Sequence, residues 1–256
     1  MTALEGLAPW LNVAIWHGFA IFLRVAAVAA LMPAFGERSV PTRVKLVLAL
    51  AFTVIIAPSV STSSPPTDVT GLSQLILAEI VSGVALGLGL RLFILALQTA
   101  GSIAAQSTSL SQVLGGAAVD PLPAMGYILV VAGMALAVMS GLHIKAVQLL
   151  IMSYDFLPLG RFPEASDISQ WGVTQVARAF SLAFTLAAPF VVLSVLYNVA
   201  LGAINRAMPQ LMVAFVGAPL ITAGGLALLL IASPYMLLVW VEAMDRFLAN
   251  PLSTAP

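Results

Sequence analysis

The sequence contains no cysteine and very little charge. Without Cys the chain has no disulfide, no thiolate metal site and no cysteine nucleophile. Its ten basic and ten acidic residues give zero net charge, where an average soluble domain of this length would carry roughly 64 charged residues. Because no run is rich in Lys or Arg, nucleic acid is excluded as a partner. A soluble enzyme is nearly excluded too, because a soluble core cannot bury a chain that is 61% apolar.

Long uncharged apolar runs are what the sequence has instead. A membrane crossing needs about 20 mostly apolar residues, and a further stretch, Gly71–Leu97, is apolar apart from Glu79 and Arg91. The sequence therefore predicts an all-α, polytopic integral membrane protein with about six long, kinked hydrophobic helical segments. The uncharged runs are Gly6–Leu23, Leu46–Thr67, Leu92–Val119, Pro121–Ile144, Ala179–Asn205 and Ala207–Val241.

The last two segments are longer than a simple crossing requires. As one helix, Val173–Ile204 would reach roughly 48 Å, against a hydrocarbon core of about 30 Å. Pro189, Pro219 and Pro234 fall inside these runs, and each removes a backbone hydrogen bond and favours a kink. Two alternatives stay open: helices that are broken or that project beyond the bilayer while packed on other protein, or ordinary tilted helices with interfacial ends.

Ionisable residues inside the apolar runs are the place to look for transport chemistry. Glu79 and Arg91 are 12 residues apart, a rise of roughly 18 Å on a helix, so they cannot pair with each other. Each needs a partner elsewhere or a watery setting. One hypothesis is a secondary transporter that uses both Glu79 and Arg91. The alternative is a structural ion pair with a partner elsewhere. The small-residue spacing of Gly83 and Gly87 predicts a close helix approach there.

No motif for catalysis or for a cofactor occurs. His17 and His143 are isolated, with no carboxylate or second His at ligand spacing, so no metal site is predicted. Nucleophile elbows, phosphate loops and paired carboxylates are absent from the sequence. We therefore expect a protein that is not an enzyme and has no cofactor.

The segment Gln98–Gln112 is polar but uncharged, with nine hydroxyl or amide side chains. It leads to Gly115 and Gly116 and then to Asp120 and Pro121, which predict the start of a helix over Pro121–Ile144. Irregular backbone at membrane depth is tolerated where it is buried in protein or lines a cavity. The segment is interpreted either as a gate or plug in a conduit, or as an ordinary loop.

Several short motifs run in order over roughly residues 20 to 225: Arg24 with Met32–Gly36 and Val40–Lys45, then Asn198–Gly202, Arg206, Pro209–Leu211 and Val216–Leu220. Together they resemble the FliR family of flagellar biosynthetic proteins, with its SctT injectisome counterparts. The run Val216–Leu220 looks more flagellar than injectisome-like. Ser153-Tyr154 and Leu157–Gly160 also look like one of the family's joints. The matching positions that we take as structural motif residues are Arg24, Pro33, Pro41, Arg43, Asn198, Gly202, Arg206, Pro209, Gln210, Gly217 and Pro219.

The resemblance implies a non-enzymatic subunit of the flagellar type III secretion export gate, which helps form and gate an inner-membrane pore for unfolded flagellar proteins. Implied partners are FliP and FliQ in a core complex, FlhB and FlhA of the export apparatus, and membrane lipids. The implied location is the bacterial inner membrane within the flagellar basal body, projecting toward the periplasm. The implied organisation is a FliP-like part over residues 1–170, a FliQ-like hairpin over 171–248 and a short tail over 249–256.

The resemblance also implies that the central loop, residues 98–121, plugs the pore. This chain departs from related loops, because Ser107 follows Gln106 and no aromatic occurs before Tyr127. An apolar seal would then rest on Leu110, Val113 and Leu114. The expected plug or gate residues are Gly101, Gln106, Leu110, Val113, Leu114, Gly115, Gly116, Asp120 and Pro121.

Overall fold

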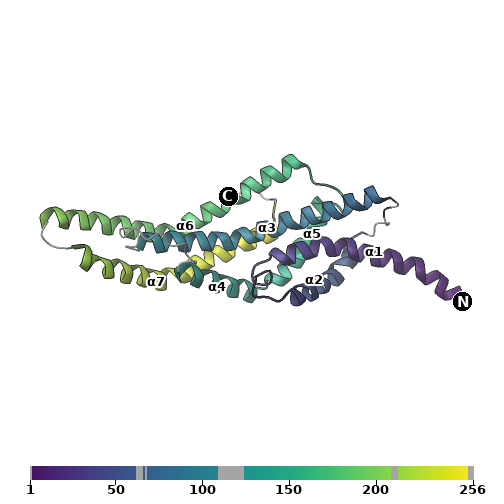
Figure 1. Ribbon diagram of the computed structural model, residues 1–256, viewed down its shortest axis with the longest axis horizontal. Coiled ribbons are helices and arrows are strands. Elements are labelled where there is room, and N and C mark those ends of the chain that lie inside the picture. The colour runs from purple at the N-terminus through teal and green to yellow at the C-terminus, as the bar shows by residue number, and fades with distance from the viewer. Residues whose placement is uncertain (1, 62–65, 67, 109–123, 209–212, 253–256) are drawn as a thin grey trace. The chain divides into compact units, whose positions relative to one another are not determined.

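The computed structural model describes residues 2–61, 66, 68–108, 124–208 and 213–252, and these residues form helices with no strand among them (Figure 1). A short 3-10 turn, Ala57–Ser59, follows the second helix. The α-helices are α1 (Thr2–Leu31), α2 (Thr42–Ile56), α3 (Val69–Thr108), α4 (Ala124–Met139), α5 (Leu142–Phe156), α6 (Ala165–Ala207) and α7 (Val213–Ala249).

The chain divides into two compact units. Unit 1 consists of Met1–Leu92, Ala137–Gln175 and Met244–Pro256, and unit 2 of Phe93–Leu136 and Val176–Ala243. The predicted division at residues 170 and 171 concerns family-like parts, and it stays a prediction.

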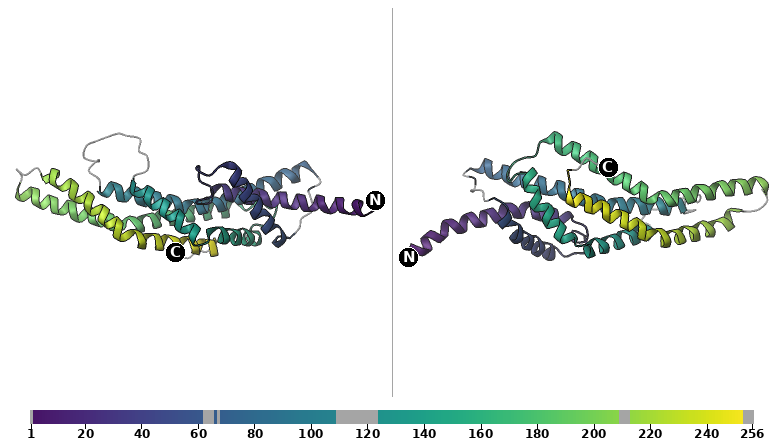
Figure 2. Two further views of the ribbon diagram at one scale, coloured as in Figure 1. Left: turned by 90° about the horizontal axis from the view of Figure 1, so that it is seen from below. Right: turned by 180° about the vertical axis from the view of Figure 1, so that it is seen from behind.

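Unit 1 is built around α1, which packs against α2 and against the first half of α3. The view of Figure 1 and the further views of Figure 2 all show α2 beside α1. On α3 the glycines create the contact: a Cβ built on Gly83 would lie 2.6 Å from the carbonyl oxygen of Arg24, and one on Gly87 would lie 2.9 Å from the Cβ of Leu31. The predicted close approach at this glycine pair is confirmed, because any larger side chain would push α1 away.

Unit 2 has its own buried apolar contacts. The indole Nε1 of Trp240 donates a hydrogen bond of 2.8 Å to the carbonyl oxygen of Phe93, which satisfies the one polar atom of a fully buried ring. Gly101 of α3 meets Gly126 of α4 so closely that a Cβ on Gly101 would lie 2.2 Å from the Gly126 Cα. Fully buried apolar side chains of this unit are Ile94, Leu97, Ala100, Ala104, Leu129, Ala183, Ala187, Phe190 and Trp240.

The predicted fold class is confirmed. Five helices of the described chain are long and apolar enough to cross a membrane: α1, α2 with its 3-10 turn, α3, α6 and α7. The pair α4 and α5 also passes the test together, although it is bent by 71°. Counted as one span, this pair brings the number to six, in agreement with an all-α polytopic membrane protein.

Two of the predicted segment boundaries are wrong. Gly71–Leu97 and Leu92–Val119 were expected as separate candidates, but α3 is one helix of 40 residues that carries Glu79 and Arg91 within it. Conversely, the expected helix Pro121–Ile144 stops at Met139. Gly141 ends it, because this residue adopts the left-handed conformation (φ 83°) that glycine tolerates, and α5 begins immediately after it.

The prolines do not break the last two helices. α6 runs for 43 residues across Pro189, and α7 runs for 37 residues across Pro219 and Pro234. The prediction that these helices are broken is therefore wrong, whereas their projection beyond the bilayer stays a prediction. In apolar surroundings every other backbone group must keep its partner inside the helix, so the local loss at a proline does not end it. Both helices have far more residues than the roughly 20 that one crossing needs.

Candidate functional site: a buried ion pair and an adjoining cavity

A buried ion pair joins α1 and α3 in unit 1. The Nε of Arg24 lies 2.8 Å from Oε2 of Glu79, and its Nη2 lies 3.1 Å from Oε1. Neither side chain has any exposed surface. This two-pronged geometry is the strongest arrangement that a guanidinium and a carboxylate form.

Further polar groups surround the pair and complete its hydrogen bonding. Arg24 donates from Nη1 to the hydroxyl of Ser153 (3.1 Å) and from Nη2 to the carbonyl oxygen of Leu157 (2.9 Å). The backbone N–H of Gly160 donates to Oε1 of Glu79 at 2.9 Å. The guanidinium also lies over the ring of Tyr154, 3.9 Å from its centroid. Four of the five N–H groups of the guanidinium therefore donate a hydrogen bond to an oxygen atom.

This network fixes the segment between α5 and α6. Leu157 and Gly160 belong to that joint, and both hold the ion pair through backbone atoms. Gly160 adopts a left-handed conformation (φ 72°), which turns its N–H inward without side-chain strain. The motif Ser153-Tyr154 with Leu157–Gly160 thus has a packing reason: its members supply the remaining contacts of a charge pair that has left water.

The second predicted ionisable residue is also paired. Arg91 forms an ion pair with Glu37, in the segment between α1 and α2, and both side chains are only partly buried. The expectation that Glu79 and Arg91 each find a partner elsewhere is confirmed. Since Glu79 is fully buried and hydrogen-bonded, the arrangement is that of a structural ion pair.

The segment between α1 and α2 is tightly built as well. Ala34 adopts a left-handed conformation (φ 66°). Gly36 lies against the end of α1, where a Cβ would come 2.5 Å from the carbonyl oxygen of Ala30. Lys45 of α2 donates from Nζ to the Gly36 carbonyl oxygen at 2.8 Å. The glycine of the Met32–Gly36 motif is therefore required by a backbone contact.

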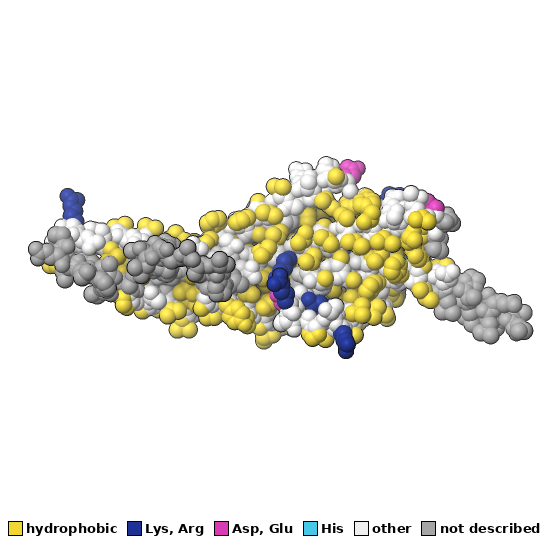
Figure 3. Space-filling view, viewed as in Figure 1, with side chains coloured by type: hydrophobic (Ala, Val, Ile, Leu, Met, Phe, Trp, Pro, Cys, Tyr) yellow, Lys and Arg dark blue, Asp and Glu magenta, His cyan; other side chains and the backbone are white. Residues whose placement is uncertain are grey.

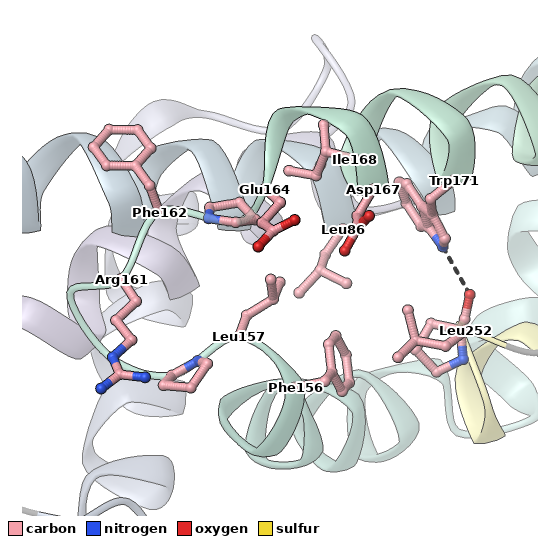
Figure 4. Close-up of a pocket in the computed structure, with 14 residues that line it drawn as sticks. Leu86, Phe156, Leu157, Arg161, Phe162, Glu164, Asp167, Ile168, Trp171 and Leu252 are labelled. Atoms are coloured by element: carbon pink, nitrogen blue, oxygen red, sulfur yellow. Dashed lines mark hydrogen bonds between the residues drawn. The ribbon is translucent and has the colours of Figure 1, made fainter.

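A cavity of about 350 Å³ lies beside the buried ion pair, within unit 1 (Figure 4). It is bounded by Ala85 and Leu86 of α3, the joint between α5 and α6, the first turns of α6, and Pro251 and Leu252 after α7. A hydrogen bond of 2.8 Å from the indole Nε1 of Trp171 to the carbonyl oxygen of Pro251 holds two of these walls together.

The cavity combines apolar walls with acidic side chains at one side. In Figure 4 the carboxylates of Glu164 and Asp167 turn toward the open space, above Leu86 and Leu157, while Arg161 points away from it. Sequence reasoning missed this site. Its only signal was the charged joint over residues 153–170, and no spacing along the chain indicates that Leu86 and Leu252 meet that joint.

The expected plug residues are described only in part. Gly101 and Gln106 lie in the last turns of α3, where Gly101 packs on Gly126 in unit 2. Their role in a plug stays a prediction. The other expected plug residues lie outside the described residues: Leu110, Val113, Leu114, Gly115, Gly116, Asp120 and Pro121.

The family-motif residues occupy different kinds of position. Arg24 and Pro33 are buried, Pro41 precedes α2 as its N-cap residue, and Arg43 is exposed on α2. The structure thus brings Arg24 into the buried network and leaves Arg43 at the surface. Three motif residues are exposed along α6 (Asn198, Gly202 and Arg206), two lie in α7 (Gly217 and Pro219), and Pro209 and Gln210 lie outside the described residues.

The two histidines are placed separately. His17 is buried on α1, with its Nε2 at 3.1 Å from the carbonyl oxygen of Ala57, and His143 is exposed on α5. Within the described ranges, no group of three or more His, Asp or Glu side chains is arranged to hold a metal ion.

Fold and site together define an all-α polytopic membrane protein with a fully buried Arg24–Glu79 ion pair between two of its helices. The chain matches the family described as "Bacterial export proteins, family 1" over residues 15–247, and it belongs to that family. The Flagellar biosynthetic protein FliR of Caulobacter vibrioides is 34% identical over 232 residues, which cover 89% of this chain and 92% of that protein.

Other relatives carry the same description. The Flagellar biosynthetic protein FliR of Escherichia coli is 32% identical over 239 residues, covering 90% of this chain and 87% of the relative. The one of Bacillus subtilis is 26% identical over 243 residues, covering 90% and 93%. The resemblance found in the sequence motifs is confirmed: this is a membrane protein of the flagellar export family.

Proposed function

We propose that the chain is a non-enzymatic subunit of the flagellar type III secretion export gate. In this role it helps form and gate the inner-membrane pore through which unfolded flagellar proteins are exported. The observation that carries the proposal is family membership over residues 15–247, together with relatives described as flagellar biosynthetic proteins.

The exposed apolar surface supports a role inside an assembly. Figure 3 shows one face on which apolar side chains predominate and charged ones are few. Such surface needs lipid or protein neighbours. We propose FliP and FliQ as the core partners, with FlhB and FlhA contacting the assembly. Large apolar side chains exposed on α6 include Val176, Phe180, Phe184, Val191, Val192, Val195, Leu196 and Val199, and those on α7 include Leu220, Leu226, Leu230, Ile231 and Leu238.

The proposed organisation follows the family-like parts. Residues 1–170 form a FliP-like part and residues 171–248 a FliQ-like helical hairpin, for which the two very long helices α6 and α7 are the support. We place the protein in the inner membrane within the flagellar basal body, projecting toward the periplasm. Helices that exceed a single crossing agree with a part that lies outside the bilayer against protein.

The proposed gate is the segment over residues 98–121. Its described part is the polar end of α3, where the hydroxyls of Ser107 and Thr108 donate to the carbonyl oxygen of Ala104 at 2.8 and 2.9 Å. These side chains are therefore satisfied within the helix and leave the seal to apolar residues. We propose that Leu110, Val113 and Leu114 form that seal, and that Gly115 and Gly116 give the backbone the conformational freedom that a moving plug needs.

Deletion of the gene tests the export role. We expect loss of filament assembly and motility, restored by a second copy of the gene. A deletion strain that keeps its filaments and motility but loses uptake of a small solute would replace the export proposal with the transporter that relies on Glu79 and Arg91.

The plug has a separate test. Removal of residues 107–117, or the triple replacement of Leu110, Val113 and Leu114 by Ser, should raise ion leakage across the inner membrane. The matched control replaces Ser109 and Ser111 by Ala, which keeps the apolar residues and should leave the leak at its original level. An unchanged leak in the triple variant would remove the seal assignment.

A further inference from the structure

The cavity beside the ion pair has no part in the proposed export role, and its construction points to a ligand. Its volume of about 350 Å³ is in the range of small-molecule sites. The Arg24–Glu79 network fixes the Leu157–Gly160 wall, and the Trp171 hydrogen bond to Pro251 fixes the opposite one. The space is therefore held open by tertiary contacts on both sides.

The walls suit an acyl chain. Apart from Arg161, Glu164, Asp167 and Trp171, the side chains that line the cavity from α3, the α5–α6 joint, α6 and the tail are hydrocarbon without a hydrogen-bonding group. The apolar wall residues include Ala85, Leu86, Phe156, Leu157, Ile168 and Leu252. Burial of each methylene of a chain in such a space is favourable because it removes apolar surface from water.

The charged side of the cavity selects the head of that ligand. Glu164 and Asp167 are exposed and direct their carboxylates toward the space, the ring of Trp171 lies next to Asp167, and Arg161 turns away (Figure 4). Two carboxylates and an indole attract an ammonium group. They repel a headgroup that carries only the negative charge of a phosphate.

The cavity also lies where headgroups are expected. The bent candidate span made of α4 and α5 ends at Phe156, the candidate span α6 begins at Ala165, and the joint between them forms one wall of the cavity. The tail that follows α7 at Ala249 closes it from another side. Ends of apolar spans coincide with the polar boundary of a bilayer.

We propose that this cavity binds a phospholipid whose headgroup carries an ammonium group, such as phosphatidylethanolamine. One acyl chain occupies the apolar space, and the ammonium group donates to the carboxylates of Glu164 and Asp167. Both acids also lie near the N-terminus of α6, where negative charge is favourable in any protein. If they only stabilised this end of the helix, the protein would show no preference between the ethanolamine and the glycerol lipid.

Photo-crosslinking tests the proposal on the full chain purified in detergent. The protein is incubated with phosphatidylethanolamine or phosphatidylglycerol that carries a diazirine in one acyl chain, illuminated and digested with trypsin. We expect the ethanolamine lipid to label the tryptic peptides over residues 146–161 and 162–178 at least several-fold more than the glycerol lipid. Equal labelling by both lipids, or no labelling of these peptides, would overturn the proposal.

Two variants separate the head from the chain. Glu164→Gln with Asp167→Asn should reduce ethanolamine-lipid labelling to the level of the glycerol lipid, whereas Glu242→Gln, at an exposed carboxylate of α7, should leave the preference intact. Ala85→Phe keeps both acids but fills the cavity, so it should lower labelling by either lipid. A preference that survives the acid replacements, or labelling that survives Ala85→Phe in a protein with unchanged melting temperature, contradicts the assignment.

Discussion

Arg24 on α1 and Glu79 on α3 form a two-pronged ion pair, with hydrogen bonds of 2.8 and 3.1 Å and no exposed surface on either side chain. The two residues are 55 positions apart, so the pair exists only in the folded chain. A charge that has left water depends on its partner, and loss of one member leaves the other uncompensated.

Glu79→Gln is therefore expected to destabilise the protein by about 3–5 kcal/mol, because the neutral amide leaves the Arg24 guanidinium buried and unpaired. The melting temperature of the purified chain in detergent, followed by loss of helical circular dichroism, measures the change. The control is Glu37→Gln in the partly exposed pair with Arg91, where about 0–1 kcal/mol is expected. Equal losses in both variants would contradict the view that burial sets the cost.

Replacing Arg24 and Glu79 together tests whether the two charges depend on each other. Arg24→Met combined with Glu79→Leu removes both charges and keeps apolar volume, so the double variant should be more stable than Glu79→Gln alone. Unfolding free energies of the double and the two single variants form a cycle, and strictly additive losses would mean that the pair is not coupled.

Gly83→Ala is expected to cost about 1–3 kcal/mol, because the added Cβ would meet backbone of α1, 2.6 Å from the Arg24 carbonyl oxygen. The control is Gly172→Ala on α6, where no atom lies within 4 Å of the new Cβ. There the helix propensity of Ala should make the change neutral or stabilising by up to about 1 kcal/mol. Thermal unfolding of both variants checks this, and a tolerated Gly83→Ala would mean that α1 and α3 separate easily.

Gly101 and Gly126 touch each other, yet alanine should be tolerated at one of them only. A Cβ on Gly101 would lie 2.2 Å from the Gly126 Cα, whereas a Cβ on Gly126 would meet its nearest neighbours at 3.7 Å. Gly101→Ala is therefore expected to lower the melting temperature by several degrees, and Gly126→Ala to leave it nearly unchanged. The reverse order would show that the α3–α4 contact differs from the one described here.

Asp68 stabilises the start of α3 in a pH-dependent manner. Its carboxylate accepts hydrogen bonds from the Thr70 hydroxyl (2.6 Å) and the Gly71 N–H (3.3 Å), and these bonds lower the pKa of Asp68 below its ordinary value. A lowered pKa in the folded state adds stability above the unfolded pKa, and this is lost as pH falls through the folded one.

The stability difference between the wild type and Asp68→Asn should accordingly shrink below about pH 4. Melting temperatures of the two proteins across the acidic range provide the measurement. A difference that stays constant with pH would show that the ionised carboxylate has no special role at this helix start.

Sequence periodicity and run length predicted the long apolar helices, but they placed several ends wrongly. The two ionisable residues inside the α3 region suggested separate spans, and tertiary ion pairs with Arg24 and Glu37 explain why one continuous helix carries both. Pro189 suggested a break in α6 that the structure does not have. A proline inside a helix shows an energetic cost at its own position, whereas the environment of the helix decides whether it continues.

The sequence by itself determined that the chain avoids water, that it is helical, and that its motifs belong to the flagellar export family, because composition and short motifs are properties of the chain alone. Only the tertiary structure decided that Arg24 pairs with Glu79, that Gly101 of α3 packs on Gly126 of α4, and that the α5–α6 joint lines a cavity. Each of these depends on residues far apart in the chain, whose meeting is set by packing in three dimensions and by the need to compensate every buried charge.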